Sequence, residues 1–170
     1  MLTRGLVLSC FALGLWAQSP PSPPSTSSQA LVLDDAQKAR CAQEARRVTQ
    51  ALGEACQRLD IDAALKDWLD DGTSLAVAAE GYLVEPKALR EGLRAFYASL
   101  ASLRFTTLRD EVRVLAPDLV LQCWCYQVEG TTRSGTPFTV ETETATFLLR
   151  KRGGAWKIIF FQESAAPAKR

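Results

Sequence analysis

Histidine is absent from this sequence of 170 residues. The absence removes the commonest general base and the commonest imidazole ligand of metal ions. Clusters of one charge are lacking as well, because 20 basic residues are balanced by 19 acidic ones without a long run of either sign. A nucleic-acid or anionic-membrane surface needs clustered lysine and arginine, so the sequence predicts neither partner. It also predicts no cofactor and no metal site.

The first apolar stretch, residues 5–16, is too short to span a bilayer. Arg4 before it and the small residue Ala17 after it are typical of a signal peptide, which we expect over residues 1–17. The prediction is an exported chain, periplasmic or secreted, without a transmembrane segment after cleavage. Lipidation of Cys10 is a minor alternative.

The rest of the chain divides into three parts by composition. Residues 18–29 contain four prolines among serine, threonine and glutamine, which predicts an extended linker. Residues 30–165 have the composition of one globular domain, and residues 166–170 form a short tail.

The cysteines of the domain are poorly spaced for local disulfides. Cys41 and Cys56 lie on one predicted helix at a separation of roughly 22 Å. Cys123 and Cys125 share one face of a predicted strand, about 7 Å apart. Any disulfide must therefore join the helix to the strand, and four buried thiols are the alternative. The spacing lacks the CxxC pair typical of a zinc site.

Helical periodicity marks the first half of the domain. Helices are predicted over residues 34–58 and 62–69, and a third begins at Pro86, because proline favours the first helical position. Residues 74–79 form a short apolar run that could be a strand.

From residue 104 onward the period changes to two, and turn residues separate the segments. The predicted strands are residues 104–115, 119–129, 137–151 and 156–163. Short turns imply antiparallel neighbours. The expected fold is α+β, a cone-shaped cup in which three N-terminal helices pack on a curved, mainly antiparallel sheet.

The last predicted strand is apolar on both faces. Strict alternation points Trp156, Ile158 and Phe160 into the cup, with Gln162 beside them. Ile159 and Phe161 would then face outward. An outward apolar face needs a partner, so we expect a homodimer through the outer face of the sheet.

Three local signatures follow one another along the domain. They are LDIDAAL with WLDD in residues 59–71, EG with PKALREGLRAFY in residues 80–97, and GGAWKIIFFQES in residues 153–164. In this order they resemble the nuclear-transport-factor-2-like (NTF2-like) superfamily and its SnoaL-like group. The resemblance covers about residues 34–165. It implies a cystatin-like α+β cup whose relatives include isomerases, cyclases, hydrolases and ligand binders, so it does not by itself imply a reaction.

The catalytic groups of the best-known branches are missing. The resemblance to steroid isomerases would place an aspartate in residues 72–77 and a tyrosine in the helix over residues 34–58, and this sequence has neither there. Branches that use a His–Asp dyad are disfavoured because the chain has no histidine.

Residues of the second helix, the third helix and the sheet remain as candidates for the lining of the cup. The ligand-binding candidates are Trp68, Tyr82, Tyr97, Trp124, Tyr126 and Gln162, and the weak catalytic candidates are Asp70, Glu141 and Glu143. Aromatic residues with polar tips suit a flat apolar ligand, although the same residues often simply fill a core. Asp70 could instead end a helix in water, and the two glutamates could be rim charges.

The sequence favours a non-catalytic, ligand-binding or accessory cup. Alternatives are an isomerase-like or hydrolytic enzyme that uses a pocket carboxylate, and a protein-interaction domain. A carboxylate of residue 141 or 143 that points into the cavity near Tyr126 or Trp124 would support the enzyme.

Overall fold

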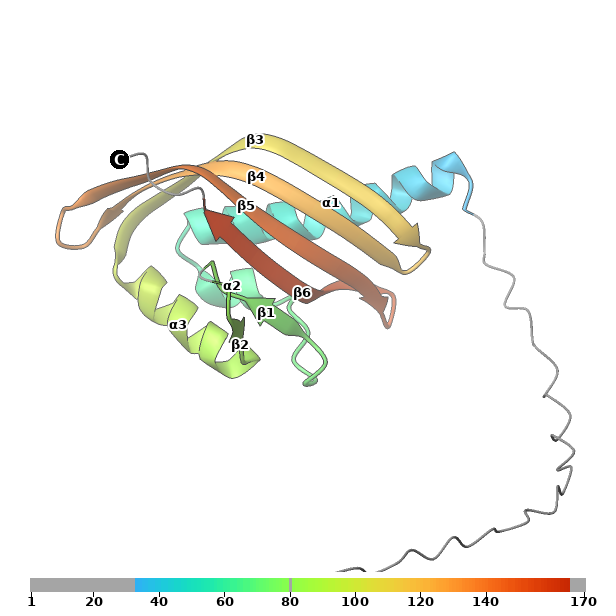
Figure 1. Cartoon of the computed structure of the whole chain (residues 1–170), viewed down its shortest axis with the longest axis horizontal. Helices are drawn as coiled ribbons and strands as arrows, with labels where there is room; N and C mark the ends of the chain where they lie inside the picture. The colour runs from blue at the N-terminus through green and yellow to red at the C-terminus, as the bar shows by residue number, and fades with distance from the viewer. Residues whose placement is uncertain (1–32, 80, 166–170) are drawn as a thin grey trace, which may run out of the picture. The chain divides into compact units, whose positions relative to one another are not determined.

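The computed structural model describes residues 33–79 and 81–165, so the predicted signal peptide, linker and tail lie outside the described residues. A six-stranded sheet in the order β2-β1-β6-β5-β4-β3 carries the helices on one side (Figure 1). The elements are α1 (Asp35–Gln57), α2 (Ile61–Leu65), β1 (Leu75–Val77), β2 (Leu83–Val84), α3 (Pro86–Ala98), β3 (Leu100–Ala116), β4 (Leu119–Thr132), β5 (Pro137–Arg152) and β6 (Ala155–Ala165). Within the described residues, none of the helices is long and apolar enough to cross a membrane.

Helix α1 begins and ends with defined caps. Asp34 and Gln37 form a reciprocal capping box at its start, which satisfies two backbone N–H groups that the helix leaves free. At its end the chain turns through Leu59, which has a φ of 57°. The N–H of Asp60 donates to the carbonyl of Ala55, as in a Schellman motif.

Small residues allow α1 to lie close to the sheet. Its buried positions are Ala45, Thr49, Gly53, Ala55 and Cys56. A Cβ atom on Gly53 would lie 3.0 Å from the Trp124 ring, so glycine permits this close approach. The core therefore fills the space between α1 and β3–β6, with Val120, Phe147, Leu149 and Ile158 almost inaccessible.

The sheet confirms the predicted α+β class and the antiparallel succession of four long strands. Residues 74–79 do contain a strand, and β1 pairs with β6 in parallel. The strand β2 was not predicted, because it is only two residues long. The second helix ends at Leu65 rather than at residue 69, since the chain there forms a parallel bridge between Trp68 and Ile158.

Two β-bulges change the direction of side chains. The β5–β6 register skips Ile159, because Leu148 pairs with Phe160 while Leu149 pairs with Ile158. Phe161 and Glu163 therefore face the helices, and the prediction that Phe160 and Gln162 do so is wrong.

The second bulge lies in β5. Tyr126 pairs with Glu143 and Val128 pairs with Val140, so residues 141 and 142 together oppose Gln127 alone. Val140 and Glu143 consequently line the same cavity, while Glu141 is exposed. Strict alternation along the strand predicted over residues 137–151 would place Glu141 and Glu143 on one face, and this prediction is wrong because the bulge separates them.

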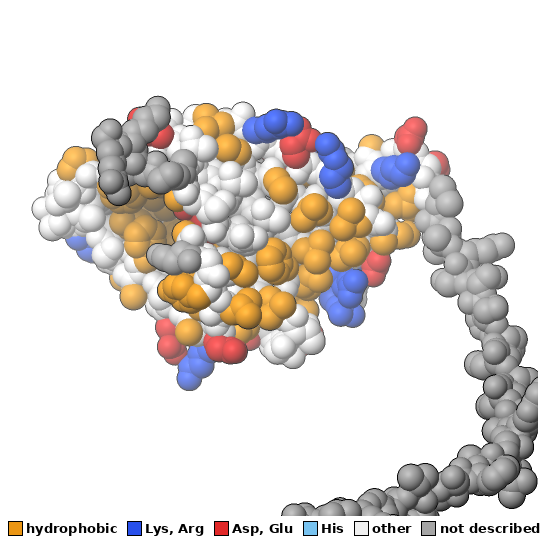
Figure 2. Space-filling view, in the orientation of Figure 1, with side chains coloured by type: hydrophobic (Ala, Val, Ile, Leu, Met, Phe, Trp, Pro, Cys, Tyr) orange, Lys and Arg blue, Asp and Glu red, His pale blue; other side chains and the backbone are white. Residues whose placement is uncertain are grey.

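An apolar row crosses the outer face of the sheet. The ladders align Leu75, Phe160, Leu148 and Leu121 side by side from β1 to β4. Leu75 at the start of the row is 56% exposed. Figure 2 shows hydrophobic side chains gathered over this side of the sheet.

The four cysteines of the described residues are free thiols. Cys56 is buried under the sheet, whereas Cys123 and Cys125 alternate with the inward-facing residues of β4 and lie on the outer face. A disulfide between these positions would have to pass through the sheet. The alternative of four thiols therefore holds, although only Cys56 is fully buried and the other three are partly exposed.

Candidate functional site

The cup between the sheet, α2 and α3 contains two adjoining compartments. The inner one has a volume of about 70 Å³ and is lined mainly by aliphatic and aromatic side chains. Its lining includes Leu52, Cys56, Ile61, Trp68, Trp124, Tyr126, Phe147 and Phe161. The outer one measures about 440 Å³. Four residues line both compartments, Leu93, Tyr97, Phe105 and Glu163, so the two form one cup that opens beside α3, at the hollow visible in Figure 2.

Helix α3 forms one wall of this cup. Arg94 of α3 pairs with Asp62 of α2 at 2.9 Å, and the Arg90 guanidinium donates to the carbonyl oxygen of Trp68 at 3.4 Å. These contacts hold Leu93 and Tyr97 over the sheet, because they tie α3 to α2 and to the segment that follows α2.

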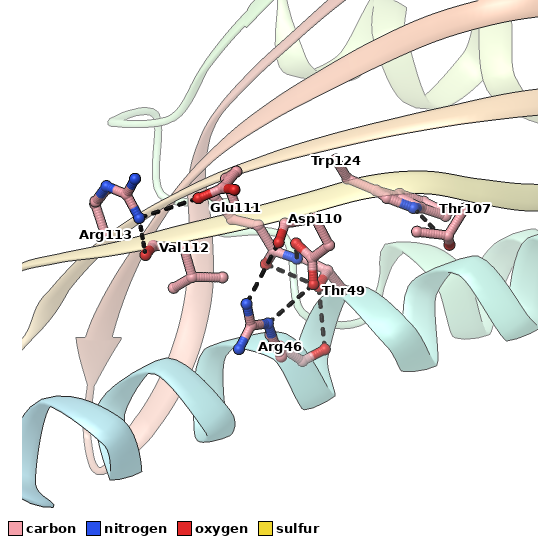
Figure 3. Close-up of polar contacts among 9 residues, drawn as sticks. Arg46, Thr49, Thr107, Asp110, Glu111, Val112, Arg113 and Trp124 are labelled. Atoms are coloured by element: carbon pink, nitrogen blue, oxygen red, sulfur yellow. Dashed lines mark hydrogen bonds and ion pairs between the residues drawn. The ribbon is translucent and has the colours of Figure 1, made fainter.

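Aromatic rings form the opposite wall. The ring centroids of Trp124 and Tyr126 are 4.4 Å apart, and Phe105 packs 5.5 Å from the first and 5.2 Å from the second. The Trp124 indole also donates to the Thr107 hydroxyl at 2.9 Å, which fixes the ring orientation (Figure 3). Such a rigid aromatic surface suits an apolar ligand.

A polar network holds β3 and β4 against α1 beside this wall. Arg46 donates to the Asp110 carboxylate at 2.9 Å (Figure 3). Gln122 donates to the other carboxylate oxygen at 2.8 Å. Thr49 completes the network by donating to Gln122. The side chains of this network satisfy one another, so we assign the network a structural role.

Two carboxylates stand at the junction of the compartments. The Tyr126 hydroxyl donates to Glu163 Oε1 at 2.7 Å, and Tyr126 is the direct cross-strand neighbour of Glu143. Burial, and secondarily the negative charge of Glu163, raise the pKa of Glu143 to about 7. The pKa of Tyr126 is raised by burial and by both glutamates, so its phenol stays protonated and remains a donor.

Cys56 and Tyr97 meet deeper in the cup. Burial raises the pKa of the Cys56 thiol and also that of the Tyr97 phenol. Both groups are therefore neutral near pH 7. A protonated thiol is a poor nucleophile, so the geometry does not support Cys56 as a covalent catalyst.

The structure brings four of the six predicted lining residues together, since Trp68, Tyr97, Trp124 and Tyr126 all border the inner compartment. The other two lie elsewhere. Tyr82 is 60% exposed near β2, and Gln162 is exposed on the outer face because of the bulge at Ile159.

The weak catalytic candidates separate in the same way. Glu143 lines the outer compartment, whereas Asp70 is exposed and lies 3.7 Å from Arg90, and Glu141 is exposed at the second bulge. Sequence reasoning missed Glu163, because strict alternation gave its inward place to Gln162. The sequence could indicate only that either Gln162 or Glu163 faces inward, because adjacent residues of a strand point to opposite faces.

Two features bear on ligands of the site. The indole Nε1 of Trp68 is buried and has no hydrogen-bond partner among the described residues. That part of the chain also contains no group of three or more cysteine, aspartate and glutamate side chains placed to hold a metal ion.

The sequence matches neither a protein-family profile nor a curated protein. The fold, in contrast, matches many solved structures. A candidate dehydratase of the NTF2-like family from Streptomyces avermitilis superposes with a TM-score of 0.67 at 16% identity, covering 77% of this chain and 99% of its own. An NTF2-like superfamily protein from Salmonella enterica gives 0.67 at 12% identity, covering 77% and 94%. The association domain of C. elegans CaMKII gives 0.59 at 23% identity, covering 78% and 100%.

Proposed function

We propose that this chain, whose fold is that of the NTF2-like superfamily, binds a small and mainly apolar molecule in its cup. The observation that carries the proposal is the aromatic inner compartment, which continues into a wider one bordered by carboxylates. Concave apolar sites with a few convergent polar groups are the usual form of small-molecule sites.

The volumes limit how such a ligand is placed. The inner compartment, at about 70 Å³, is smaller than the roughly 150 Å³ cavity that accommodates benzene. A ring therefore does not fit there alone. The ligand must place a narrow apolar end among Trp68, Phe147 and Phe161, and its bulk in the outer compartment beside Leu93 and Phe105.

Binding of the uncharged fluorescent probe N-phenyl-1-naphthylamine tests the proposal. Its emission should rise on addition of the protein, because the probe enters an apolar site. Leu93→Trp should weaken binding at least about tenfold, because Leu93 borders both compartments and the larger indole would fill the space between them. A misfit of one methylene in a hydrophobic pocket already costs about 1–3 kcal/mol, or roughly 10- to 200-fold. Ala88→Trp, at an exposed position of the same helix, is the matched control. Equal binding by both variants would contradict a site in the cup.

A second candidate function is acid–base catalysis at Glu143, of the isomerase-like or hydrolytic kind. It is favoured by one observation, the pKa of about 7 that burial and Glu163 give to a carboxyl group beside the Tyr126 hydroxyl. A general base works best when its pKa lies near the working pH. An ordinary carboxyl pKa for Glu143 would remove this candidate.

We also propose that two copies pair through the apolar row of the outer face, defined by Leu75, Phe160, Leu148 and Leu121. Neighbours of this fold that are association domains support self-assembly as a class of behaviour. Docking of a different protein on the same row is the alternative. Export of the chain remains our proposal from the residue pattern of its first 17 positions.

A further inference from the structure

We infer that the ligand of the cup carries an ammonium group, which binds between the carboxylates of Glu143 and Glu163. This inference rests on the proposed ligand-binding function and names the class of ligand, a small hydrophobic amine. Both glutamates line the outer compartment, which measures about 440 Å³.

The two carboxylates are placed to share one cation. Ala145 is the cross-strand partner of Glu163, and Glu143 is two residues before Ala145 on β5. Glu143 and Glu163 are therefore diagonal neighbours on one face, and such positions lie about 7–8 Å apart in an antiparallel ladder. Two glutamate side chains at that spacing can both reach an ammonium group between them, which has three donors to offer.

The surroundings favour a cation over other polar groups. Other partly buried carboxylates of this chain meet a basic side chain, as Glu44 meets Lys151 and Asp110 meets Arg46. Glu143 has no lysine or arginine partner among the described residues, although it is half-buried. A carboxylate in such a place is stabilised by a cation that comes with a ligand.

The other titratable groups of the cup do not supply that charge. Cys56 from α1, Tyr97 from α3 and Tyr126 from β4 are the ones that line it besides the two glutamates. All three are neutral near pH 7, because burial raises their pKa values. Tyr126 is already used as a donor to Glu163, so it holds that carboxylate in place beside Glu143.

The test is displacement of bound N-phenyl-1-naphthylamine by two matched compounds, 2-phenylethylamine and 2-phenylethanol. They share one apolar body and differ in the charged group. At pH 8 the amine should displace the probe at a concentration at least about tenfold lower than the alcohol, which is the effect of a charge-assisted hydrogen bond. Its advantage should shrink at pH 6, because Glu143 then holds a proton while the alkylammonium stays charged.

Glu143→Gln should abolish most of the preference for the amine and change displacement by the alcohol less than about twofold. Glu141→Gln is the matched control, because it removes the same charge from an exposed position of the same strand. Lys169→Ala with Arg170→Ala tests whether the chain's own basic tail, outside the described residues, competes for the site. A preference that grows in this variant supports the cation site.

The outcomes separate the two proposals. Failure of the probe to bind overturns the ligand-binding cup itself. Binding of the probe with equal displacement by amine and alcohol overturns only the ammonium site. The ammonium site is also overturned if Glu143→Gln and Glu141→Gln reduce the preference for the amine equally, since the preference would then come from the net charge of the protein.

Discussion

At the scale of single residues, position on a strand decides the chemistry. Glu141 and Glu143 are two residues apart, yet only the second borders the cup. Trp124 and Tyr126 both border the inner compartment, because no bulge on β4 separates these two from one another. That they bind a ligand stays a prediction. It exchanged Glu163 for Gln162, because a bulge adds one residue without a mark in the residue pattern.

The raised pKa of Glu143 predicts a pH-dependent stability. Below about pH 4.5 the carboxyl is protonated in both the folded and the unfolded state. Between pH 4.5 and about 7 only the folded state keeps the proton, so this group makes stability fall as the pH rises. Glu143→Gln removes the effect. Its free energy of unfolding relative to the wild type should therefore increase from pH 4.5 to 8.

The expected gain is about 1 kcal/mol, discounted because the group is only half-buried and water screens it. Urea denaturation at several pH values measures the free energy of unfolding of the variant relative to the wild type. For Glu141→Gln this difference should not change with pH. A flat profile for Glu143→Gln would mean an ordinary pKa, and acid–base catalysis at this residue would lose its support.

At the scale of elements, helix starts and residue periods were predictable from the sequence, whereas strand pairings were not. Asp34, Asp60 and Pro86 mark helix starts through local chemistry that the sequence shows. The parallel pairing of β1 with β6 depends on residues about 85 positions apart, as Leu75 and Phe160 are, so local patterns do not reveal it. Edge strand β3 is long, but its bulges interrupt the ladder and discourage pairing with another edge.

Two glycines in different elements should respond oppositely to alanine. Gly92 lies inside α3 and a Cβ atom there has no neighbour within 4 Å, so Gly92→Ala should stabilise the protein by about 0.5–1 kcal/mol.

A Cβ atom on Gly130 would overlap the Phe138 ring and lie 2.9 Å from the Ser102 carbonyl oxygen. Gly130→Ala should therefore cost about 1–3 kcal/mol, the usual effect of overpacking. Thermal unfolding of both variants checks the pair, and a stabilised Gly130→Ala would contradict the close contact of Gly130 with Phe138 and Ser102.

At the scale of the whole molecule, helices cover one face of the sheet, and none of the described helices covers the other. The sequence indicated this from Ile159 and Phe161, and the structure replaces that pair with a row of Leu75, Phe160 and Leu148 continued by Leu121. The prediction of an apolar outer face is still correct, although other residues form it. The reason is that residues 158–161 of β6 are all apolar, so an apolar side chain faces outward wherever the bulge lies.

The proposed homodimer gives the last prediction. Leu148→Lys places a charge in the middle of the apolar row, where a second copy would have to bury it without a partner. The change should shift the wild-type dimer to a monomer while the fold is retained, because Leu148 points away from the core formed by Phe147 and Leu149. Sedimentation equilibrium measures the mass, and circular dichroism checks the fold.

Ala88→Lys, at an exposed position of α3, adds the same charge away from the apolar row, so this control variant should remain dimeric. A wild-type chain that sediments as a monomer would instead leave the row to a different protein partner, and a Leu148→Lys variant that stays dimeric would place the interface elsewhere.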